Sequence, residues 1–385
     1  MARVFGETEM HYFSEVLASR QLGWREGGMV TRFEQAFAAK VGCSHAIARN
    51  SAMSALAEAV SISGAGTATE VICDPMVQFG AIAALYFNAV PRFADVKPDT
   101  YLMDPASLRA NITPQTRAVI VTNLWGLCAE LDEIRRICDE HKIFMIEDCA
   151  HSIGSTWKGK HSGTYGDMGC FSFQQGKHMT TGDGGMMTTN RADLYQRLFD
   201  EWAFGESPSF MTLNFRMNEV TGAVGLAQLQ RIDEYLAEYT QNLQTMNAAI
   251  QGCAWLRPRH VPADAYQTGY IWACTWAGDQ HGLELDRFKQ TTKELGLNLR
   301  FGFIGKPAYQ FDLFNVSTAY NHADCPVRCP LYTSTSDYRY HPGLCPVAED
   351  LMPRIVSLGL VEAPPDDVKR RADLLQQAIR LTEQG

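Results

Sequence analysis

Short apolar runs that alternate with helical segments are the feature that most constrains the fold of this chain. The predicted strands are Val71–Cys73, Ala118–Leu124 and Ile143–Ile146, and the predicted helices are Met76–Phe87 and Leu131–His141. Such alternation is typical of βαβ units, in which helices cover both faces of a mostly parallel sheet. The sequence therefore predicts an α/β protein. Reactive side chains are expected just past the carboxyl ends of its strands.

The second half of the chain predicts a further domain. Apolar residues recur every three or four positions along Ile232–Ile250, which predicts one long amphipathic helix. After Gly252 the pattern changes to a strand-like run at Tyr270–Ala277, separate helices and a long irregular stretch. We therefore predict a large domain over residues 1–250, which includes the N-terminal helices and the long helix. A smaller α+β domain is predicted over residues 251–385.

Charge and composition narrow the classes of partner. The 385 residues carry a net charge of −9, and 46% of them are apolar. An acidic balance disfavours nucleic acid and anionic membranes as partners. The apolar runs are shorter than the ~18 residues that cross a bilayer. The first residues also lack the basic-then-apolar order of a signal peptide, so a cytoplasmic protein is expected.

The eleven cysteines are scattered along the chain. Free buried cysteine behaves as a small apolar residue, which suits a reducing compartment. A tighter cluster of His322, Cys325 and Cys329 has a spacing that could ligate zinc, but the paired Cys-x2-Cys knuckles are missing. An irregular packed loop is the favoured interpretation, and no metal site is predicted.

A single lysine lies in a polar turn between two predicted strands. Lys177 follows the run Cys170–Phe173, and Gly184-Gly185 then leads into the run Met186–Thr189. A partly desolvated amine loses its proton more easily than a surface amine and can form a Schiff base with an aldehyde cofactor. A solvated loop lysine is an equally good interpretation of this stretch by itself.

Two other strand ends carry polar groups. Glu147 and Asp148 follow Ile143–Ile146 directly, and acids there are costly unless they cap a helix or meet a cation. Their position at the end of a central strand favours a functional carboxylate. Asn50-Ser51 precedes the predicted helix Ala52–Ile62, where free backbone N–H groups could bind a phosphate. Plain N-capping by Ser51 is the alternative.

Taken in order, these motifs resemble those of the DegT/DnrJ/EryC1/StrS family. The resemblance rests on Asp148, on the lysine turn with its Gly-acid-Gly-Gly tail, and on Asn214-Phe215-Arg216. It extends from Arg20–Trp24 to a Cys-Pro-x-Ala-Glu segment at Cys345–Glu349. It implies a fold-type I, pyridoxal phosphate (PLP)-dependent aminotransferase that acts on sugars or cyclitols.

The resemblance also implies roles for individual residues. Lys177 would bind PLP as a Schiff base and shuttle protons, and Asp148 would pair with the pyridinium nitrogen. The other implied cofactor contacts are His151 near the ring hydroxyl, Phe79 on the ring face, and Ser172 with the amides near Met53 and Ser54 at the phosphate. Asn214 would reach the phosphate bound by a neighbouring subunit, which implies a homodimer with shared active sites.

Departures from the family pattern bear on the reaction. The Ser-Gly-Thr of the phosphate turn is here Ser51-Ala52-Met53, so one hydroxyl is missing. Asn123 stands where a histidine is common, at a strand end expected to face the acceptor pocket. The family's sugar dehydratases carry histidine at the lysine position. Because this chain keeps Lys177, transamination is favoured over dehydration.

The substrate is less constrained. Gln174-Gln175 resembles the subgroup that acts on inososes with glutamine as donor, and also the aminohydroxybenzoate synthases. We therefore expect L-glutamine or L-glutamate as donor and a free cyclitol or sugar ketone as acceptor, in natural-product or aminoglycoside-type biosynthesis. A nucleotide-linked keto-sugar is the alternative, with Lys158, Lys160, Arg300 and Lys306 available for a diphosphate. A PLP-dependent dehydratase or aromatising synthase, and a regulator without turnover, are less favoured.

Overall fold

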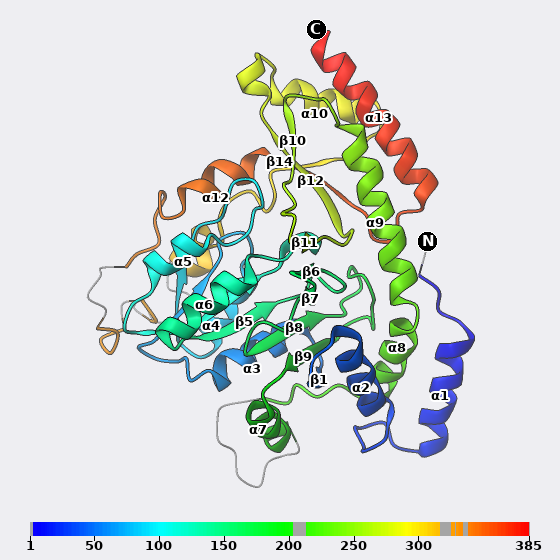
Figure 1. The fold of residues 1–385 in the computed structure, drawn as a ribbon, viewed down its shortest axis with the longest axis vertical. Helices are drawn as coiled ribbons and strands as arrows, with labels where there is room; N and C mark the ends of the chain where they lie inside the picture. The colour runs from blue at the N-terminus through cyan, green and yellow to red at the C-terminus, as the bar shows by residue number, and fades with distance from the viewer. Residues whose placement is uncertain (1–2, 203–212, 316–324, 328, 334–337, 385) are drawn as a thin grey trace.

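Seven strands form the largest sheet of the structure, a computed structural model that describes residues 3–202, 213–315, 325–327, 329–333 and 338–384 (Figure 1). They are β1 (His45–Arg49), β2 (Glu70–Cys73), β3 (Val90–Phe93), β4 (Thr116–Thr122), β5 (Phe144–Asp148), β8 (Met168–Ser172) and β9 (Gly185–Thr189). Their order across the sheet is β1-β9-β8-β5-β4-β2-β3. The sheet thus places β5 and β8, which end in Asp148 and Ser172, side by side.

The sheet is mostly parallel, as predicted. Strands β3, β2, β4, β5 and β8 run parallel, whereas β9 is antiparallel to both β8 and β1. The apolar pattern of a buried strand carries no direction, so the reversal at β9 was not predicted. Val119 and Ile120 point to opposite faces of β4 and are both buried, which means that both faces of the sheet are covered.

Nine α-helices are formed by the described residues before residue 250. They are α1 (Glu7–Ser19), α2 (Met29–Val41), α3 (Ala52–Ile62), α4 (Phe79–Tyr86), α5 (Pro105–Asn111), α6 (Leu131–His141), α7 (Ala192–Trp202), α8 (Glu219–Leu229) and α9 (Ile232–Ala249). Helix α4 begins three residues later than predicted, because the Asp74 carboxylate accepts the Met76 N–H and holds a turn there. Helix α8 was missed. A Cβ at its Gly225 would lie 2.4 Å from Phe33, so close packing against α2 demands a residue that otherwise disfavours helix.

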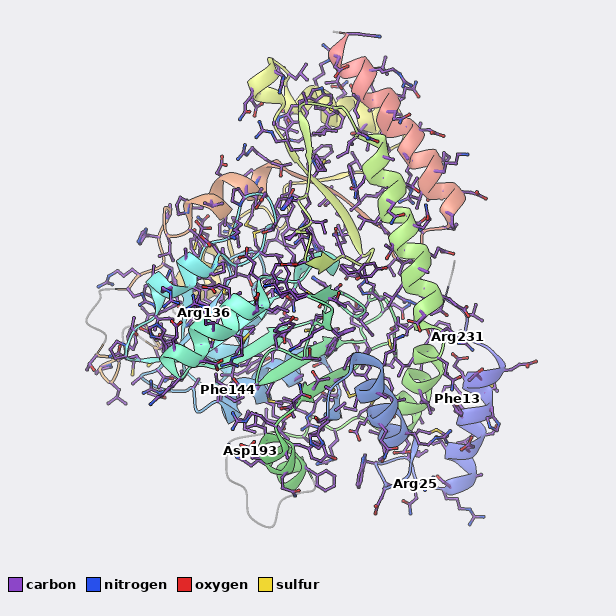
Figure 2. All side chains as sticks on the ribbon, in the orientation of Figure 1. Phe13, Arg25, Arg136, Phe144, Asp193 and Arg231 are labelled. Carbon is purple, nitrogen blue, oxygen red and sulfur yellow. The ribbon has the colours of Figure 1, made fainter. Side chains whose placement is uncertain are left out.

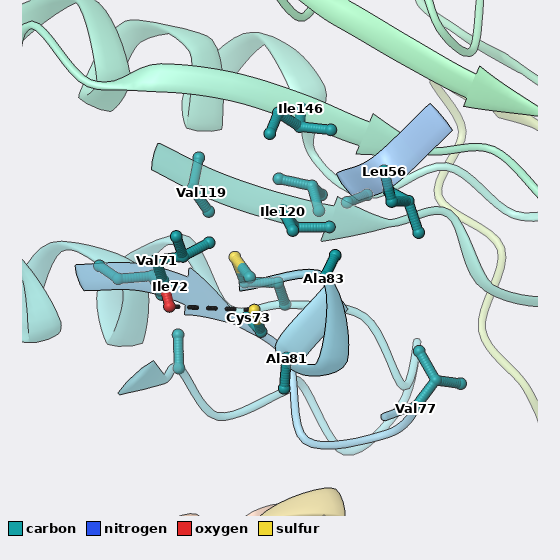
Figure 3. Packing of buried hydrophobic residues seen from close by; sticks show 14 of the residues in the cluster. Leu56, Val71, Ile72, Cys73, Val77, Ala81, Ala83, Val119, Ile120 and Ile146 are labelled. Carbon is teal, nitrogen blue, oxygen red and sulfur yellow. Dashed lines mark hydrogen bonds between the residues drawn. The ribbon is translucent and has the colours of Figure 1, made fainter. Parts of the chain in front are cut away.

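The largest apolar core lies around β2 and β4, with side chains from α3 and α4 (Figure 3). Leu56, Ile72, Ala81 and Ile120 belong to this core, and all four are buried. Cys73 belongs to the same core, and its thiol donates to the carbonyl oxygen of Val71 at 3.9 Å. None of the eleven cysteines, all of which the structure describes, forms a disulfide bond, in agreement with their predicted role as small apolar residues.

A second sheet lies in the C-terminal part of the chain. Its strands are β10 (Leu256–Pro258), β12 (Ile271–Trp276), β14 (Ile355–Gly359) and β13 (Arg300–Phe301), in that order, and all neighbours are antiparallel. The long helix α9 packs along α13 (Pro365–Glu383), and α10 (Leu285–Glu294) also contacts α13 (Figure 1).

The segment between β13 and β14 returns to the large sheet. Tyr309, Cys345 and Met352 are buried in the core cluster that also holds β2 and β4. A three-stranded sheet also joins β11 (Ala265–Tyr266) to β6 (Thr156–Trp157) and β7 (Lys160–His161). The division of the chain at residue 250 stays a prediction. In the part of the chain that the structure describes, no helix is long and apolar enough to span a membrane.

Substitution of Phe37 tests how helix α2 stabilises the strand that leads to the lysine turn. Its ring is fully buried on α2, 5.0 Å from the ring of Phe171 and 5.5 Å from that of Phe173 (centroid distances). Phe37→Ala is expected to lower the free energy of unfolding by about 3–5 kcal/mol in urea denaturation, since a cavity replaces these contacts. Gln35→Ala, on the exposed face of the same helix, should change it by less than about 0.5 kcal/mol. Equal effects of the two substitutions would contradict this packing.

Candidate active site

A cavity of about 270 Å³ opens where the ends of β5 and β8 meet the start of α3. Its lining residues are Ser51, Ala52, Met53, Leu56, Phe79, Asp148, Ala150, Ser172, Gln174, Lys177, Asp183 and Gly184. Five of the predicted site residues are therefore brought together: Met53, Phe79, Asp148, Ser172 and Lys177. His151, Ser54 and Asn214 do not line this cavity.

Lys177 is held in a tight turn of the connection between β8 and β9. Its N–H donates to the Gln174 carbonyl oxygen at 2.9 Å, and the Gly176 N–H donates to Gln174 Oε1 at 2.7 Å. Burial lowers the pKa of Lys177 to about 8, and the charge of Asp148 opposes part of this shift. At pH 7 roughly a tenth of the amine is therefore unprotonated, far more than for a surface lysine, and the unprotonated form is the nucleophile.

The two neighbouring acids at the end of β5 have different environments. Glu147 is fully buried and accepts five hydrogen bonds, from the N–H groups of Gly163, Tyr165 and Gly166, from Asn123 Nδ2 and from the Cys149 thiol. Burial raises its pKa, and these donors offset part of the shift. Glu147 therefore shapes the turn at residues 163–166. Asn123 is also fully buried and accepts from the Ala129 N–H, so its side chain braces this turn instead of facing the cavity as expected.

Asp148 faces the cavity with much of its hydrogen-bonding capacity unused. It is 3% exposed, and among the described residues it accepts one hydrogen bond, from the Ala150 N–H at 3.0 Å. Burial raises the pKa of this carboxyl, while the nearby Lys177 ammonium favours its charged form. A buried carboxylate with so few partners requires a cationic or proton-donating group in the cavity.

The start of α3 supplies the other end of the cavity. Ser51 caps the helix by accepting the Ser54 N–H at 3.0 Å, and Ala52 and Met53, its first two residues, line the cavity. A Cβ at Gly185 would lie 2.4 Å from the carbonyl carbon of Ser51, so only glycine lets β9 approach this closely. The positive end of the helix dipole and the free amides of the first turn favour an anion here.

Ser54 has other partners. Its hydroxyl donates to Asn50 Oδ1 at 2.5 Å, and it lines a neighbouring apolar cavity of about 370 Å³, which also includes Ser51 and Met53. The Ser54 amide is taken by the Ser51 cap. Capping by Ser51 is thus confirmed, and the anion-binding turn stays a prediction that would use the N–H groups of Ala52 and Met53 instead.

Three aromatic rings stack beside Lys177. Tyr270 lies between His151 and His178, with centroid distances of 4.7 and 4.9 Å, and Lys177 Nζ is 5.4 Å from the Tyr270 centroid. Burial lowers the pKa of His178 to about 3 and that of His151 well below its usual value, so both imidazoles are neutral. His151 Nδ1 is buried without a partner among the described residues.

Asn214 does not line the cavity, and His322 is not among the described residues. Asn214 is exposed, and its Oδ1 accepts the Arg216 N–H at 3.4 Å. Cys325 and Cys329 are described, whereas His322 lies outside the described residues. Across the described ranges, no group of three or more His, Cys, Asp and Glu side chains could hold a metal ion.

The cavity fits a ligand of defined chemistry. It would accept an anion at the start of α3, an aromatic ring against Phe79, a protonated ring atom at Asp148 and a carbonyl carbon within reach of Lys177. Pyridoxal phosphate has these four features.

Comparison with known proteins agrees with this chemistry. The family model of the DegT/DnrJ/EryC1/StrS aminotransferase family matches residues 4–346. GDP-perosamine synthase from Caulobacter vibrioides is 38% identical over 250 residues, which cover 61% of this chain and 67% of that protein. The L-glutamine:2-deoxy-scyllo-inosose aminotransferase of Streptoalloteichus tenebrarius is 33% identical over 299 residues, 72% of this chain and 69% of that protein. An aminotransferase structure from Psychrobacter cryohalolentis superposes with a TM-score of 0.85 at 26% identity, covering 100% of this chain and 99% of that one.

The lowered pKa of Lys177 predicts a pH-dependent stability. Between its folded value of about 8 and its ordinary value of 10.5, the unfolded chain binds more protons at this site, so stability rises with pH. Lys177→Met removes this dependence. In urea denaturation of the cofactor-free proteins, the wild type should gain about 1–3 kcal/mol relative to Lys177→Met between pH 8 and pH 10. Lys293→Met is the exposed control. Its free energy of unfolding should differ from that of the wild type by the same amount at pH 8 and pH 10. A pH-independent difference for Lys177→Met would contradict the shift.

The adjacent acids give a matched pair of variants. Glu147→Gln replaces an acceptor that serves buried N–H groups, and it should lower the free energy of unfolding by about 1–3 kcal/mol. Asp148→Asn removes a buried charge with one donor and should cost less than about 1 kcal/mol in the cofactor-free protein. Chemical denaturation without cofactor measures both. The reverse order of the two effects would overturn this assignment.

Proposed function

The chain belongs to the DegT/DnrJ/EryC1/StrS aminotransferase family of PLP-dependent sugar and cyclitol aminotransferases, and we propose that it moves an amino group from L-glutamine or L-glutamate to the ketone of a cyclitol or sugar. The observation that carries the proposal is that Lys177, with its lowered pKa, shares one cavity with the buried carboxylate of Asp148. The predicted cytoplasmic location stays a prediction.

The described residues fit the cofactor of this family. Asp148 would hold a proton on the pyridine nitrogen, which its buried charge favours. Ala52 and Met53 at the start of α3, together with Ser172, would bind the phosphate. Phe79 would cover one face of the ring, and His151 Nδ1, which lacks a partner in the described chain, would meet the ring hydroxyl.

The chain's own groups then perform the proton transfers. Bound PLP supplies an aldehyde carbon that takes up an amino group and a ring that withdraws electrons from the carbon being deprotonated. Lys177 Nζ would hold that carbon in the resting protein. Once released by the donor amine, the Lys177 amine would take the proton from the donor Cα and act as the acid that gives it back. Its lowered pKa suits both directions of this transfer, and Leu56 and Phe79 help to exclude water.

The polar lining supports a free polyhydroxylated ketone as acceptor. Gln174 lines the cavity, and its Oε1 is engaged by the Gly176 N–H, so its carboxamide N–H₂ group is the part offered to a substrate hydroxyl. The glutamine-dependent inosose aminotransferase at 33% identity acts on a ring of this kind by its name. A role in natural-product or aminoglycoside-type biosynthesis is part of this proposal.

A nucleotide-linked keto-sugar is the second candidate, favoured by the 38% identity to a GDP-perosamine synthase. Its diphosphate would need cationic partners. Lys158 is already paired with Asp132 at 2.6 Å. Lys160, Arg300 and Lys306 are exposed and do not line the cavity. The free ketone therefore remains the first choice.

A donor and acceptor panel tests the function. PLP-loaded protein is incubated with L-glutamine or L-glutamate and with a keto-cyclitol, a free keto-sugar or a nucleotide-linked keto-sugar. Mass spectrometry should find an amine in place of the ketone oxygen together with the 2-oxo acid of the donor, most readily with a free ketone. Lys177→Ala should reduce turnover at least about 10³-fold. Loss of a hydroxyl or aromatisation without nitrogen transfer would contradict transamination.

We also propose that the protein is a homodimer with shared active sites, since Asn214 is exposed beside Leu213, which is 67% exposed. A hybrid of one Lys177→Ala and one Asn214→Ala subunit, isolated with two affinity tags, should regain about half of the wild-type activity, because one of its two sites is intact. Each homogeneous variant should be weaker than the hybrid. A hybrid no more active than the Asn214→Ala protein would place Asn214 in its own subunit's site or outside the machinery.

A further inference from the structure

Arg3, near the N-terminus of the sequence, contacts the turn that carries Lys177. Its Nη1 donates to the carbonyl oxygen of Gln175, and its Nη2 donates to the carbonyl oxygen of Lys177. The Arg3 side chain is completely buried. Glu362, on the connection between β14 and α13, lies 3.7 Å from Nη1, and its own side chain is 41% exposed.

The residue that follows Arg3 is fixed to the helices beside it. The Val4 N–H donates to the Tyr235 hydroxyl at 3.2 Å, and the Val4 carbonyl oxygen accepts from Gln228 Nε2 at 3.0 Å and Arg231 Nη1 at 3.1 Å. Figure 2 shows Arg231 at the junction of α8 and α9, beside the N-terminal segment. These bonds fix the backbone next to Arg3, and they therefore restrict where its guanidinium can lie.

Both peptide groups that flank the Lys177 Cα are restrained. The Lys177 N–H donates to Gln174 within the turn, and the Lys177 carbonyl accepts from Arg3. A guanidinium presents a planar fork of donors, which suits two acceptors at a fixed separation, whereas an ammonium offers one centre. The turn also contains Gly176, whose backbone is intrinsically mobile. External hydrogen bonds therefore restrict a segment that its own sequence leaves flexible.

We propose that Arg3 is a positioning residue of the aminotransferase reaction. By binding the carbonyl oxygens of Gln175 and Lys177, it fixes the backbone of the lysine turn and directs Lys177 Nζ into the cavity. This proposal rests on the proposed role of Lys177 as the cofactor-binding and proton-transferring amine. Arg3 itself is not among the residues that line the cavity.

Substitution of Arg3 in the full chain tests the proposal with two readouts. In the cofactor-free protein, Arg3→Gln should speed amide hydrogen exchange in residues 174–182 by at least about tenfold, because the turn opens locally. In the PLP-loaded protein, the pH midpoint of the absorption change of the bound cofactor should shift, and kcat should fall by about ten- to a hundredfold, with a smaller change in the KM of the amino donor. Arg3→Lys should recover only part of each effect.

Glu362→Gln is the matched control. It removes the ion pair of Arg3 and leaves both bonds to the turn, so exchange, pH midpoint and kcat should stay within about twofold of wild type. If Arg3→Gln does not fold, Arg3→Lys is judged by the same measurements. Wild-type exchange and a wild-type pH midpoint in the folded Arg3 variants would overturn the proposal, whatever their kcat. A wild-type protein that holds no cofactor on Lys177 would instead refute the proposed function, while faster exchange in Arg3→Gln would still support the restraint of the turn.

Discussion

The electrostatic interaction between Lys177 and Asp148, two largely buried groups that line one cavity, is the interaction on which the proposed chemistry depends. Burial disfavours both charges, so it lowers the pKa of the amine and raises that of the carboxyl, while each group favours the charged form of the other. Neither charge is neutralised by a full set of hydrogen bonds. The site is therefore complementary to a ligand that brings a protonated ring nitrogen to the carboxylate and an electrophilic carbon to the amine.

The sheet explains how these two groups come to lie together. Strands β5 and β8 are parallel neighbours, with Asp148 opposite Cys170. The segments that follow the two strands therefore leave the sheet at the same edge. The alternation along β5 sends Glu147 and Asp148 to opposite sides. Glu147 organises the turn at residues 163–166, and Asp148 faces the cavity. One strand end thus carries a structural acid and the acid proposed to bind the cofactor, and the distinction comes from their surroundings.

Much of this arrangement could be predicted from the sequence, because local patterns determine it. The strand ends at Asp148 and Ser172, the turn at Lys177 and the helix start after Ser51 are each visible within about ten residues, and the parallel sheet brings them together. The direction of β9, the helix over Gly222 and Gly225, and the braced side chain of Asn123 depend on packing partners that local patterns do not show. Arg3 and Tyr270 were missed for the same reason. They contact the lysine turn across 174 and 93 residues of chain, and no local motif marks them.

Chemical trapping of the cofactor tests the central claim most directly. Borohydride reduction of the PLP-loaded protein makes the bond between the cofactor and its lysine permanent, and peptide mass spectrometry then locates the label. One phosphopyridoxyl group per chain is expected, on the peptide that contains Lys177, and none is expected on that peptide in Lys177→Ala. A label on another lysine, or no label in wild-type protein saturated with PLP, would contradict that claim.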